Sequence, residues 1–382
     1  MQRLSDSPSG KTVSIGGGQL AFIPSPLPRD LPLSPKLVLL LDNASRAVAT
    51  LAGVGETVPN PHMLAQPFIR REAVLSSRIE GTLASLSDVL AYEASGRKQS
   101  SGDVEEVRNY VVALEYGIER LESLPISFRL VNELHERLMT GVRGENKMPG
   151  HFRTTQVWIG APGSHIQEAR FIPPPPERLR YLFFEWESFV NESHNLPPLV
   201  RCALMHYQIE TIHPYLDGNG RIGRLLITLF LCASGVLTTP LLYLSAYFER
   251  DRQRYYDELL NLSVTGDWER WLSYFLDGVY RESRDVLERI RRVRSLQEEW
   301  RELLLNRGEP SSGLRLLEDL FVHPVTTAPR VSRLLEISDP GARRVLDRLI
   351  DAGIVSRIGS SRPSLYVAQR LIEEIERPIE EG

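Results

Sequence analysis

The sequence predicts an all-α protein with a small β-hairpin flap near its centre and a smaller unit of three helices and a hairpin at its C-terminal end. Two observations lead to this fold class. Through most of the chain, apolar residues recur at the three- and four-residue spacing that gives a helix one apolar face. Short β-prone runs bounded by Pro and Gly occur at residues 155–160 and again after residue 353, where the two hairpins are expected.

The first 34 residues are rich in Pro, Gly and Ser. The prolines at residues 24–28 hold the chain extended, because each one fixes its own φ and disfavours the α region for the residue before it. We expect this arm to pack along a helical body through Phe22, Ile23 and Leu27. Helices are then predicted over residues 35–51, 67–80, 104–121 and 127–138.

Beyond the flap, apolar spacing predicts helices over residues 177–191, 198–211, 220–234 and 250–262, and a long arginine-rich stretch to about residue 306. The helix over residues 198–211 is apolar on nearly every side, which predicts that it is the buried central helix. Six arginines within residues 281–294 are interleaved with acidic residues, a pattern typical of a solvated helix face.

The C-terminal unit begins near residue 310, with helices predicted over residues 314–321, 331–337 and 341–352 and strands over 354–358 and 365–367. Three helices followed by a hairpin indicate a winged helix. Its net charge is small, and Asp347 and Asp351 lie on the third helix, so a protein-docking or dimerisation role is favoured over DNA binding. The acidic residues at the end of the chain, 373–381, are interpreted as a frayed terminus.

The composition is that of an ordinary globular protein, with 382 residues, 42% hydrophobic and 25% charged. A net charge of −4 gives no case for nucleic acid as a partner of the whole chain. No apolar run reaches the roughly 18 residues of a membrane span, and the N-terminus lacks the apolar core of a signal peptide. Cys202 and Cys232 lie in apolar stretches without metal-site spacing, so we expect reduced core cysteines in a cytoplasmic protein.

The strongest chemical signal is residues 213–224, which read His-Pro-Tyr-Leu-Asp-Gly-Asn-Gly-Arg-Ile-Gly-Arg. The Asp-Gly-Asn-Gly turn leads directly into a helix, whose N-terminal N–H groups attract anions. Arg221 and Arg224 share one face of that helix and would hold a polyphosphate. Asp217 offers a carboxylate to a cation bridging the phosphates, and His213 is the one base there suited to neutral pH.

This segment resembles the signature of the Fic family, His-x-Phe-x-Asp/Glu-Gly-Asn-Gly-Arg-x-x-Arg, and the resemblance extends from about residue 20 to about residue 300. The one departure is Tyr215 in place of Phe, whose hydroxyl needs a partner or a path to solvent. The resemblance implies a Fic (Fido) helical core. It also implies a reaction in which a protein hydroxyl attacks the α-phosphate of ATP and pyrophosphate leaves.

The resemblance also implies a role for each residue of the signature. His213 would take the proton of the target hydroxyl, and Asp217 would hold Mg²⁺ between the α- and β-phosphates. The nucleotide-binding residues would be Gly218, Asn219, Gly220, Arg221 and Arg224, with Tyr255 and Tyr256 on the adenine side. The flap, resembling the family's, would pair with an extended target segment through Val157, Trp158, Ile159 and Gly160.

A second motif lies at the end of the helix predicted over residues 67–80. A glutamate at a helix C-terminus is mildly unfavourable to the dipole, so Glu80 should have a partner. Residues 76–81 resemble the Fic inhibitory motif, Ser/Thr-x-x-x-Glu-Gly/Asn, with Ser76 and Glu80 at its defining positions. The resemblance implies that Glu80 pairs with Arg224 and occupies donors that the γ-phosphate needs.

Three segments follow: residues 1–100 hold the arm and the inhibitory helix, 101–308 the catalytic core, and 309–382 the winged helix and acidic tail. The leading hypothesis is a protein adenylyltransferase that uses ATP and Mg²⁺ on a Ser, Thr or Tyr of a target protein or of itself. The alternatives are a winged-helix DNA-binding regulator whose core senses nucleotide, and a hydrolase that removes AMP at the same site. A homodimer also stays open.

Overall fold

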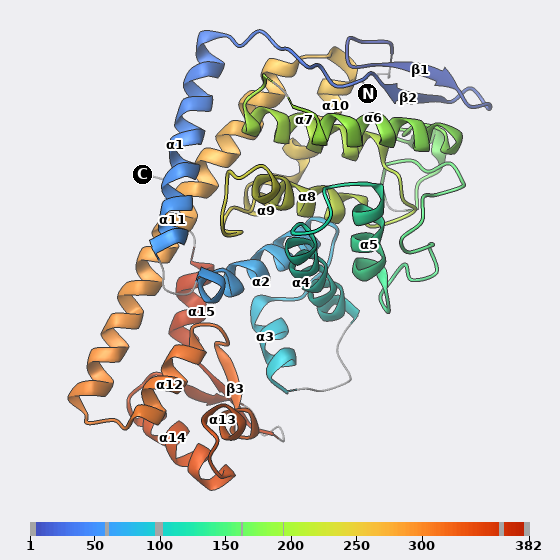
Figure 1. The fold of residues 1–382 in the computed structure, drawn as a ribbon. Helices are drawn as coiled ribbons and strands as arrows, with labels where there is room; N and C mark the ends of the chain where they lie inside the picture. The colour runs from blue at the N-terminus through green and yellow to red at the C-terminus, as the bar shows by residue number, and fades with distance from the viewer. Residues whose placement is uncertain are drawn as a thin grey trace.

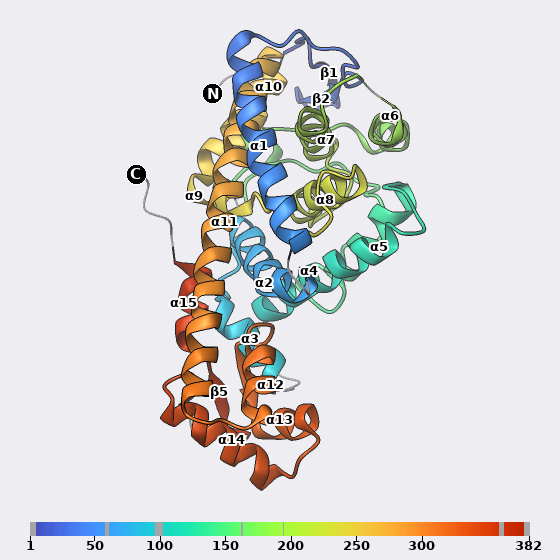
Figure 2. The same ribbon diagram turned by 60° about the vertical axis from the view of Figure 1, so that its left-hand side comes forward.

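The structure is a computed structural model, and it describes residues 5–57, 61–95, 102–161, 163–193, 195–358 and 363–377. A helical body forms the larger part of the molecule, and the C-terminal unit, residues 311–377, lies at its lower end (Figure 1). One long helix, α11 (Trp268–Asn306), runs along the side of the body and ends at the C-terminal unit (Figures 1 and 2).

The N-terminal arm is a hairpin. Strand β1 (Gly10–Ser14) pairs antiparallel with β2 (Leu20–Pro24), and glycines at positive φ form the turn between them. Phe22 and Leu27 are buried and Ile23 packs against the core, as the sequence predicted. The sequence predicted the packing of the arm correctly but did not predict that β1 and β2 pair. Strand β1 is short and has no alternation of apolar and polar residues.

Ten helices precede α11 among the described residues: α1 (Pro35–Thr57), α2 (Pro61–Ile79), α3 (Leu86–Ser95), α4 (Gly102–Arg120), α5 (Phe128–Met139), α6 (Leu179–Asn191), α7 (Pro198–Ile212), α8 (Asn219–Ala233), α9 (Ser245–Arg250) and α10 (Arg252–Thr265). Each helix predicted for the body is present. The prediction began α2 at Pro67, but the structure begins it at Pro61 and places Pro67 within it. Helices α3 and α9 were missed, because so few residues show little periodicity.

Helix α7 is the buried centre of the body, as predicted. It packs against α6, α8 and α11, and nearly all of its residues are buried, His206 among them. Cys202 is buried and Cys232 half-buried, and both are free thiols. Because α7 and α8 are fixed by packing on several sides, the loop that joins them is held in one place.

Helix α1 lies alongside α11 in both views (Figures 1 and 2). Among the described residues, Pro35–Glu56 is the one helical stretch long and apolar enough to cross a membrane. The core helix of a globular protein passes the same test, and α1 buries Leu37, Val48 and Leu51.

The C-terminal unit contains α12 (Ser311–Leu320), β3 (Val325–Thr327), α13 (Ala328–Leu335), α14 (Asp339–Asp351), β4 (Ser356–Ile358), β5 (Leu365–Val367) and α15 (Gln369–Glu376). Its antiparallel sheet has the strand order β3-β5-β4. The three predicted helices and the predicted hairpin are present, and the name winged helix stays a prediction. Residues 359–362 of the wing and 378–382 of the acidic tail lie outside the described residues.

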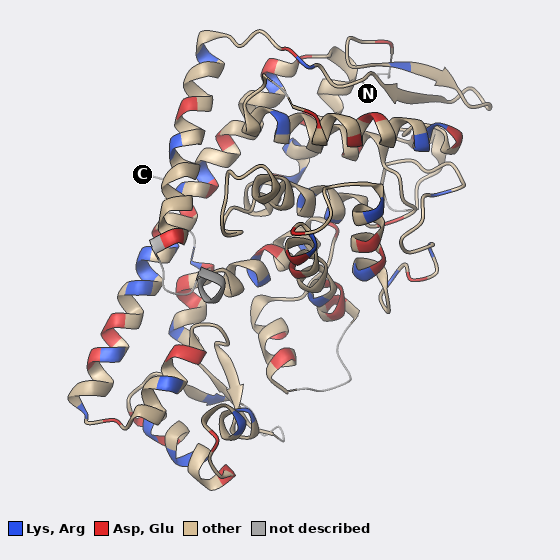
Figure 3. Cartoon of the chain, in the orientation of Figure 1, with Lys and Arg blue, Asp and Glu red and all other residues tan. Residues whose placement is uncertain are grey.

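Two predictions about charged segments are wrong in part. Part of the acidic tail forms α15, which buries Leu371, Ile372 and Ile375 and packs against α11 and α2. Basic and acidic residues alternate along α11 (Figure 3). Most arginines of the run are exposed, as predicted, but Asp285 and Arg289 are buried and form an ion pair. Opposite charges four residues apart have the same sequence pattern on a solvated helix face and between packed helices. The pattern therefore did not predict that Asp285 and Arg289 are buried.

Candidate active site

The site loop, residues 213–218, joins α7 to α8 and has a fixed shape. His213 ends α7 with a φ of 49°, and Gly218 precedes α8 with a φ of 77°. The Asn219 Oδ1 accepts from the Tyr215 N–H at 2.8 Å, and its Nδ2 donates to the Tyr215 carbonyl at 2.9 Å. The side chain of Asn219, predicted to bind nucleotide, is thus used to close the loop, which leaves its backbone N–H for a ligand.

Tyr215 is buried below the loop, and its hydroxyl has a protein partner. The hydroxyl donates to Asn132 Oδ1 at 2.7 Å, so the departure from Phe is accommodated by α5. The ring stacks on His135 at 3.7 Å between centroids. His135 Nδ1 accepts from the Gly150 N–H, so its Nε2 donates to the Asp217 carbonyl and supports the loop from below.

The Tyr215→Phe variant is expected to lose about 0.5–1.5 kcal/mol of unfolding free energy, because Asn132 Oδ1 then lacks its donor. Urea unfolding measures this difference. Tyr181→Phe is the matched control, since Tyr181 is 60% exposed and should change little. Equal stability of Tyr215→Phe and the unaltered protein would contradict the assignment of this hydrogen bond.

The imidazole of His213 is neutral and keeps one nitrogen for proton transfer. Its Nδ1 lies 3.3 Å from the Glu210 carbonyl, which only accepts, so Nδ1 carries the hydrogen and Nε2 the lone pair. Burial and the nearby charge of Arg153 lower the pKa of His213 to about 4. A base that is deprotonated near neutral pH is therefore present in the loop.

Arg153 is a site residue that the sequence did not reveal. It is buried, and its Nε donates to the His213 carbonyl at 2.9 Å while its backbone N–H donates to the Pro214 carbonyl. The guanidinium also donates to the carbonyls of Thr155 and Pro174, at either end of the flap. It thereby fixes the histidine to the flap, and no local pattern marks a single arginine for this task.

The two arginines of the motif are both buried and both face carboxylates. Arg221 Nη1 lies 3.4 Å from Glu106 Oε2, on α4. Arg224 donates from Nε to Ser76 Oγ at 2.9 Å, and from Nη2 to the Ser76 carbonyl at 2.9 Å and to Glu80 Oε1 at 2.7 Å. The predicted contact between Glu80 and Arg224 is therefore present.

The Glu80 carboxylate is held at the N-terminus of α8. Burial alone would raise its pKa, but Arg224 and Arg221 outweigh this and lower it, so Glu80 is ionised. A Cβ on Gly220 would overlap Glu80 Oε1 and would lie 2.8 Å from Arg224 Nη1. The absence of a side chain at Gly220 therefore leaves the space in which the Glu80 carboxylate and the Arg224 guanidinium meet.

Asp217 lies at the mouth of the site, with its side chain 31% exposed. Its Oδ1 accepts from the Gly218 N–H, and its Oδ2 faces the ammonium group of Lys147 at 2.9 Å. Burial raises the pKa of Asp217, but its hydrogen bonds and the lysine charge lower it overall, so the carboxylate is ionised. The described residues contain no cluster of three side chains that would bind a metal by themselves.

The two candidate adenine residues lie in different places. Tyr255 is only 1% exposed, bonds to His206 Nε2 at 2.9 Å and stacks on Phe248, so it is a core residue. The prediction that it contacts adenine is wrong for this structure, because no surface of the ring is available. Tyr256 is half-buried, its hydroxyl lies 3.5 Å from the Ile79 carbonyl, and its contact with adenine stays a prediction.

The flap is less regular than predicted. Ile159 and Phe171 form an isolated antiparallel bridge instead of a two-stranded hairpin. Trp158 is 41% exposed and donates to the Ser164 carbonyl, while Val157 and Ile159 are half-buried. Arg170 forms an ion pair with Asp257, which connects the flap to α10.

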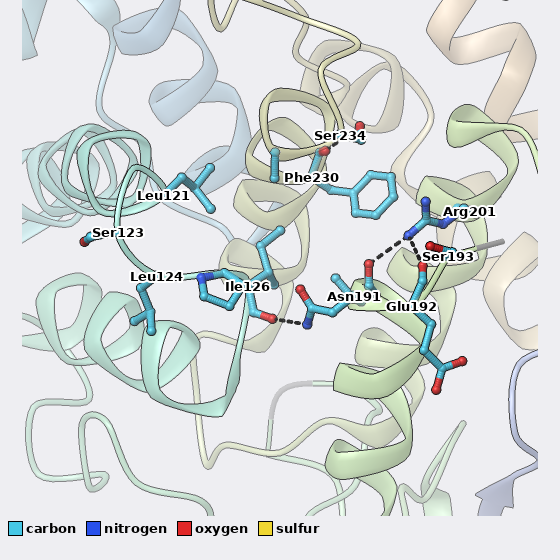
Figure 4. Close-up of a pocket in the computed structure, with 13 residues that line it drawn as sticks. Leu121, Ser123, Leu124, Ile126, Asn191, Glu192, Ser193, Arg201, Phe230 and Ser234 are labelled. Carbon is cyan, nitrogen blue, oxygen red and sulfur yellow. Dashed lines mark hydrogen bonds between the residues drawn. The ribbon is translucent and has the colours of Figure 1, made fainter.

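A cavity of about 530 Å³ lies elsewhere, between the start of α7 and the ends of α6 and α8 (Figure 4). Arg201 and Phe230 line it, and Arg201 is used in hydrogen bonds to the carbonyls of Val190 and Glu192. None of the motif residues 213–224 lines this cavity. The motif residues lie instead at the loop between α7 and α8, where Glu80 contacts Arg224.

Two family models match the chain: the Fic/DOC family N-terminal model over residues 38–119 and the Fic/DOC family model over residues 125–231. The protein adenylyltransferase Fic of Drosophila grimshawi is 29% identical over 205 residues, covering 52% of this chain and 39% of that protein. That of Drosophila melanogaster is 28% identical over 205 residues, with 52% and 38% covered. The chain thus spans under two fifths of the length of these relatives.

Two solved structures share the fold. A Fic family protein from Desulfovibrio desulfuricans G20 has a TM-score of 0.57 at 21% identity, covering 88% of this chain and 97% of that one. Fic-1 from C. elegans has a TM-score of 0.51 at 21% identity, covering 66% and 73%. At these identities the likeness establishes the arrangement of helices.

Proposed function

Because the chain belongs to the Fic/DOC family, we propose that it is a protein adenylyltransferase that transfers AMP from ATP to a Ser, Thr or Tyr hydroxyl of a target protein. One observation carries the proposal. A neutral histidine with a free Nε2 lies in the same loop as an ionised aspartate and directly before a helix N-terminus with two buried arginines. This combination suits the transfer of a phosphoryl-containing group.

In this reaction His213 Nε2 accepts the proton of the target hydroxyl. The hydroxyl oxygen then forms a bond to the α-phosphorus of ATP, the bond from that phosphorus to the bridging oxygen breaks, and pyrophosphate leaves with the electron pair. The N–H groups of Asn219 and Gly220 at the start of α8 hold phosphate oxygens. Arg221 and Arg224 neutralise the outer phosphates.

The site suits Mg²⁺ as a companion of ATP. Asp217 is an ionised carboxylate at the mouth, and it already has two cationic neighbours, Lys147 at 2.9 Å and Arg221 at 3.7 Å. A single carboxylate together with substrate phosphates is the usual protein environment of Mg²⁺. We therefore assign Asp217 as its protein ligand. When bound, the ion would supply positive charge between the α- and β-phosphates.

We further propose that Glu80 inhibits the site through its contact with Arg224. Its carboxylate occupies the Arg224 Nη2 that would otherwise face the γ-phosphate. Ser76 keeps the Nε of the same guanidinium in place whether or not Glu80 is there. The partner of the active form is a protein that presents an extended segment to the exposed edge at Trp158, and the chain itself is a second substrate.

The proposal is tested by incubating the purified Glu80→Gly variant with labelled ATP and Mg²⁺ and analysing the protein by denaturing gel and mass spectrometry. Covalently attached AMP is the expected result. Nucleotide that binds but is never transferred would favour a nucleotide-sensing regulator. Loss of AMP from a previously modified protein in the presence of the unaltered chain, which keeps Glu80 to position a water, would favour the hydrolase.

The pH dependence of transfer follows from the lowered pKa of His213. A base works in its neutral form, so activity is present above the pKa and lost below it; that pKa is about 4. Removing Glu80 takes away a negative charge that raises this pKa, so the Glu80→Gly variant should titrate no higher. We expect a flat rate between about pH 8 and pH 6, measured at saturating ATP; an inflection near the unperturbed value of about 6.5 would contradict the environment assigned to His213.

A further inference from the structure

The C-terminal unit contacts the helices on both sides of Glu80. Helix α2 ends at Ile79, and α3 begins at Leu86, so Glu80 lies in the short turn between them, residues 80–85. Helix α15 packs against α2, and strands β3 and β5 pack against α3 (Figures 1 and 2). The two helices that flank the Glu80 turn, α2 and α3, are thus each in contact with the C-terminal unit.

A buried chain of charges connects α15 to α2. Arg289 of α11 pairs with Asp285 at 2.5 Å and donates from Nη1 to the Ile375 carbonyl of α15. Arg71 of α2 lies 3.9 Å from the same carboxylate oxygen, Asp285 Oδ2. Because these groups are removed from water, none can move far without leaving a buried charge unpaired. The position of α15 and the position of α2 are therefore linked through Asp285.

The last turn of α15 reaches the end of α2 itself. Glu376 ends α15 with an exposed side chain, and partial burial still raises its pKa, while the positive charges of Arg78, Arg71 and Arg289 act against that rise. Arg78 is two residues before Glu80. An acidic group at the end of α15 thus interacts electrostatically with arginines of α2, the helix against which α15 packs.

The part of the turn next to α3, at Thr82 and Leu83, is connected to Arg221. Thr82 Oγ1 donates to Glu106 Oε2 at 3.0 Å, and Glu106 is the partner of Arg221. The Leu83 N–H donates to Asp103 at 2.8 Å, so the turn is anchored to α4 beyond Glu80. A displacement of α3 would move both Glu80 and the Thr82–Glu106 contact, and would thereby affect Arg224 and Arg221.

We propose that the C-terminal unit sets the strength of the inhibition: its docking onto α2 and α3 holds Glu80 on Arg224, and a partner that draws the unit away releases Glu80. This inference rests on the proposed function. The Glu80 side chain is 32% exposed, so it can turn to solvent, and the buried Arg224 keeps its hydrogen bonds to Ser76 when Glu80 leaves. A modest loss of docking then shifts the population towards the released form.

The first test compares two variants on α15. Glu376→Lys reverses the charge on which Arg78 and Arg71 act, and it should raise AMP transfer about three- to ten-fold, the change expected when a weak docking contact is lost. Glu373→Lys makes the same charge change on the same helix. Glu373 is exposed and accepts from Gln369 of its own helix, so this variant should match the unaltered protein.

The second test repeats both variants in the Glu80→Gly background, where Glu376→Lys should add nothing. A similar rise with and without Glu80 would overturn the inference, because the unit would then act elsewhere. If Glu80→Gly itself transfers no AMP, the proposed function fails. If Glu80→Gly is active while Glu376→Lys is silent, the proposed function stands and the inference is wrong.

A direct measurement supplements the rates. Hydrogen exchange of the backbone amides of residues 76–83 should become faster in Glu376→Lys and stay unchanged in Glu373→Lys. Arg289→Met, which removes the bond to the Ile375 carbonyl, is a second variant of the same contact, and its melting temperature shows whether it is folded. Unchanged exchange in two folded variants, Glu376→Lys and Arg289→Met, would also overturn the inference.

Discussion

Replacing His213 by alanine in the Glu80→Gly protein is expected to lower AMP transfer about 10²–10⁴-fold, the usual contribution of a positioned general base. The reason is the imidazole Nε2, which the Glu210 carbonyl orients by holding Nδ1. The site loop should keep its shape, because Asn219 closes it through the backbone of Tyr215 and not through the imidazole. ATP affinity should therefore survive the substitution while the chemical step does not.

Initial rates of AMP incorporation at saturating ATP, together with calorimetric titration of ATP, separate these two effects. His151→Ala is the matched control. His151 is exposed, precedes the flap and donates its backbone N–H, not its ring, to the Met148 carbonyl, so its removal should leave both quantities unchanged. Comparable labelling by the His213→Ala and His213 forms would mean that another group takes the proton.

Replacing Glu80 by glycine in the unaltered protein is expected to raise AMP transfer by at least about tenfold, which corresponds to about 1.4 kcal/mol of freed interaction. The substitution releases Arg224 Nη2 from the carboxylate. The guanidinium should not collapse, because its Nε still donates to Ser76 Oγ and its Nη2 to the Ser76 carbonyl. The γ-phosphate then has a positioned donor at the N-terminus of α8.

The matched control is Glu80→Gln, which keeps the size of the side chain and removes its charge. It should give a rate between those of the unaltered protein and Glu80→Gly, because an amide oxygen is a weaker acceptor for a guanidinium than a carboxylate. ATP should also raise the melting temperature of Glu80→Gly more than that of the unaltered protein. A rate for Glu80→Gly at or below that of the unaltered chain would remove the case for inhibition by this residue.

The sequence determined the parts of the site that are close together along the chain. His213, Asp217, Arg221 and Arg224 lie within 12 residues, and their geometry follows from a helix end, a turn with Gly218 at positive φ and a helix start. Such a segment has few conformations, so residue types and spacing were enough. The pairing of Glu80 with Arg224, 144 residues apart, was expected only because both motifs resemble those of one family.

The tertiary structure decided which distant side chains complete these local elements. No sequence pattern distinguishes Arg153 or Glu106 from surface residues. In the structure Arg153 connects His213 to the flap, and Glu106 faces Arg221. Asp285 and Arg289 read as an exposed ion pair and are buried between α2, α11 and α15. Periodicity reports which face of a helix is apolar, but which neighbour covers that face depends on the packing of the whole chain, and the link between the C-terminal unit and Glu80 exists only at that level.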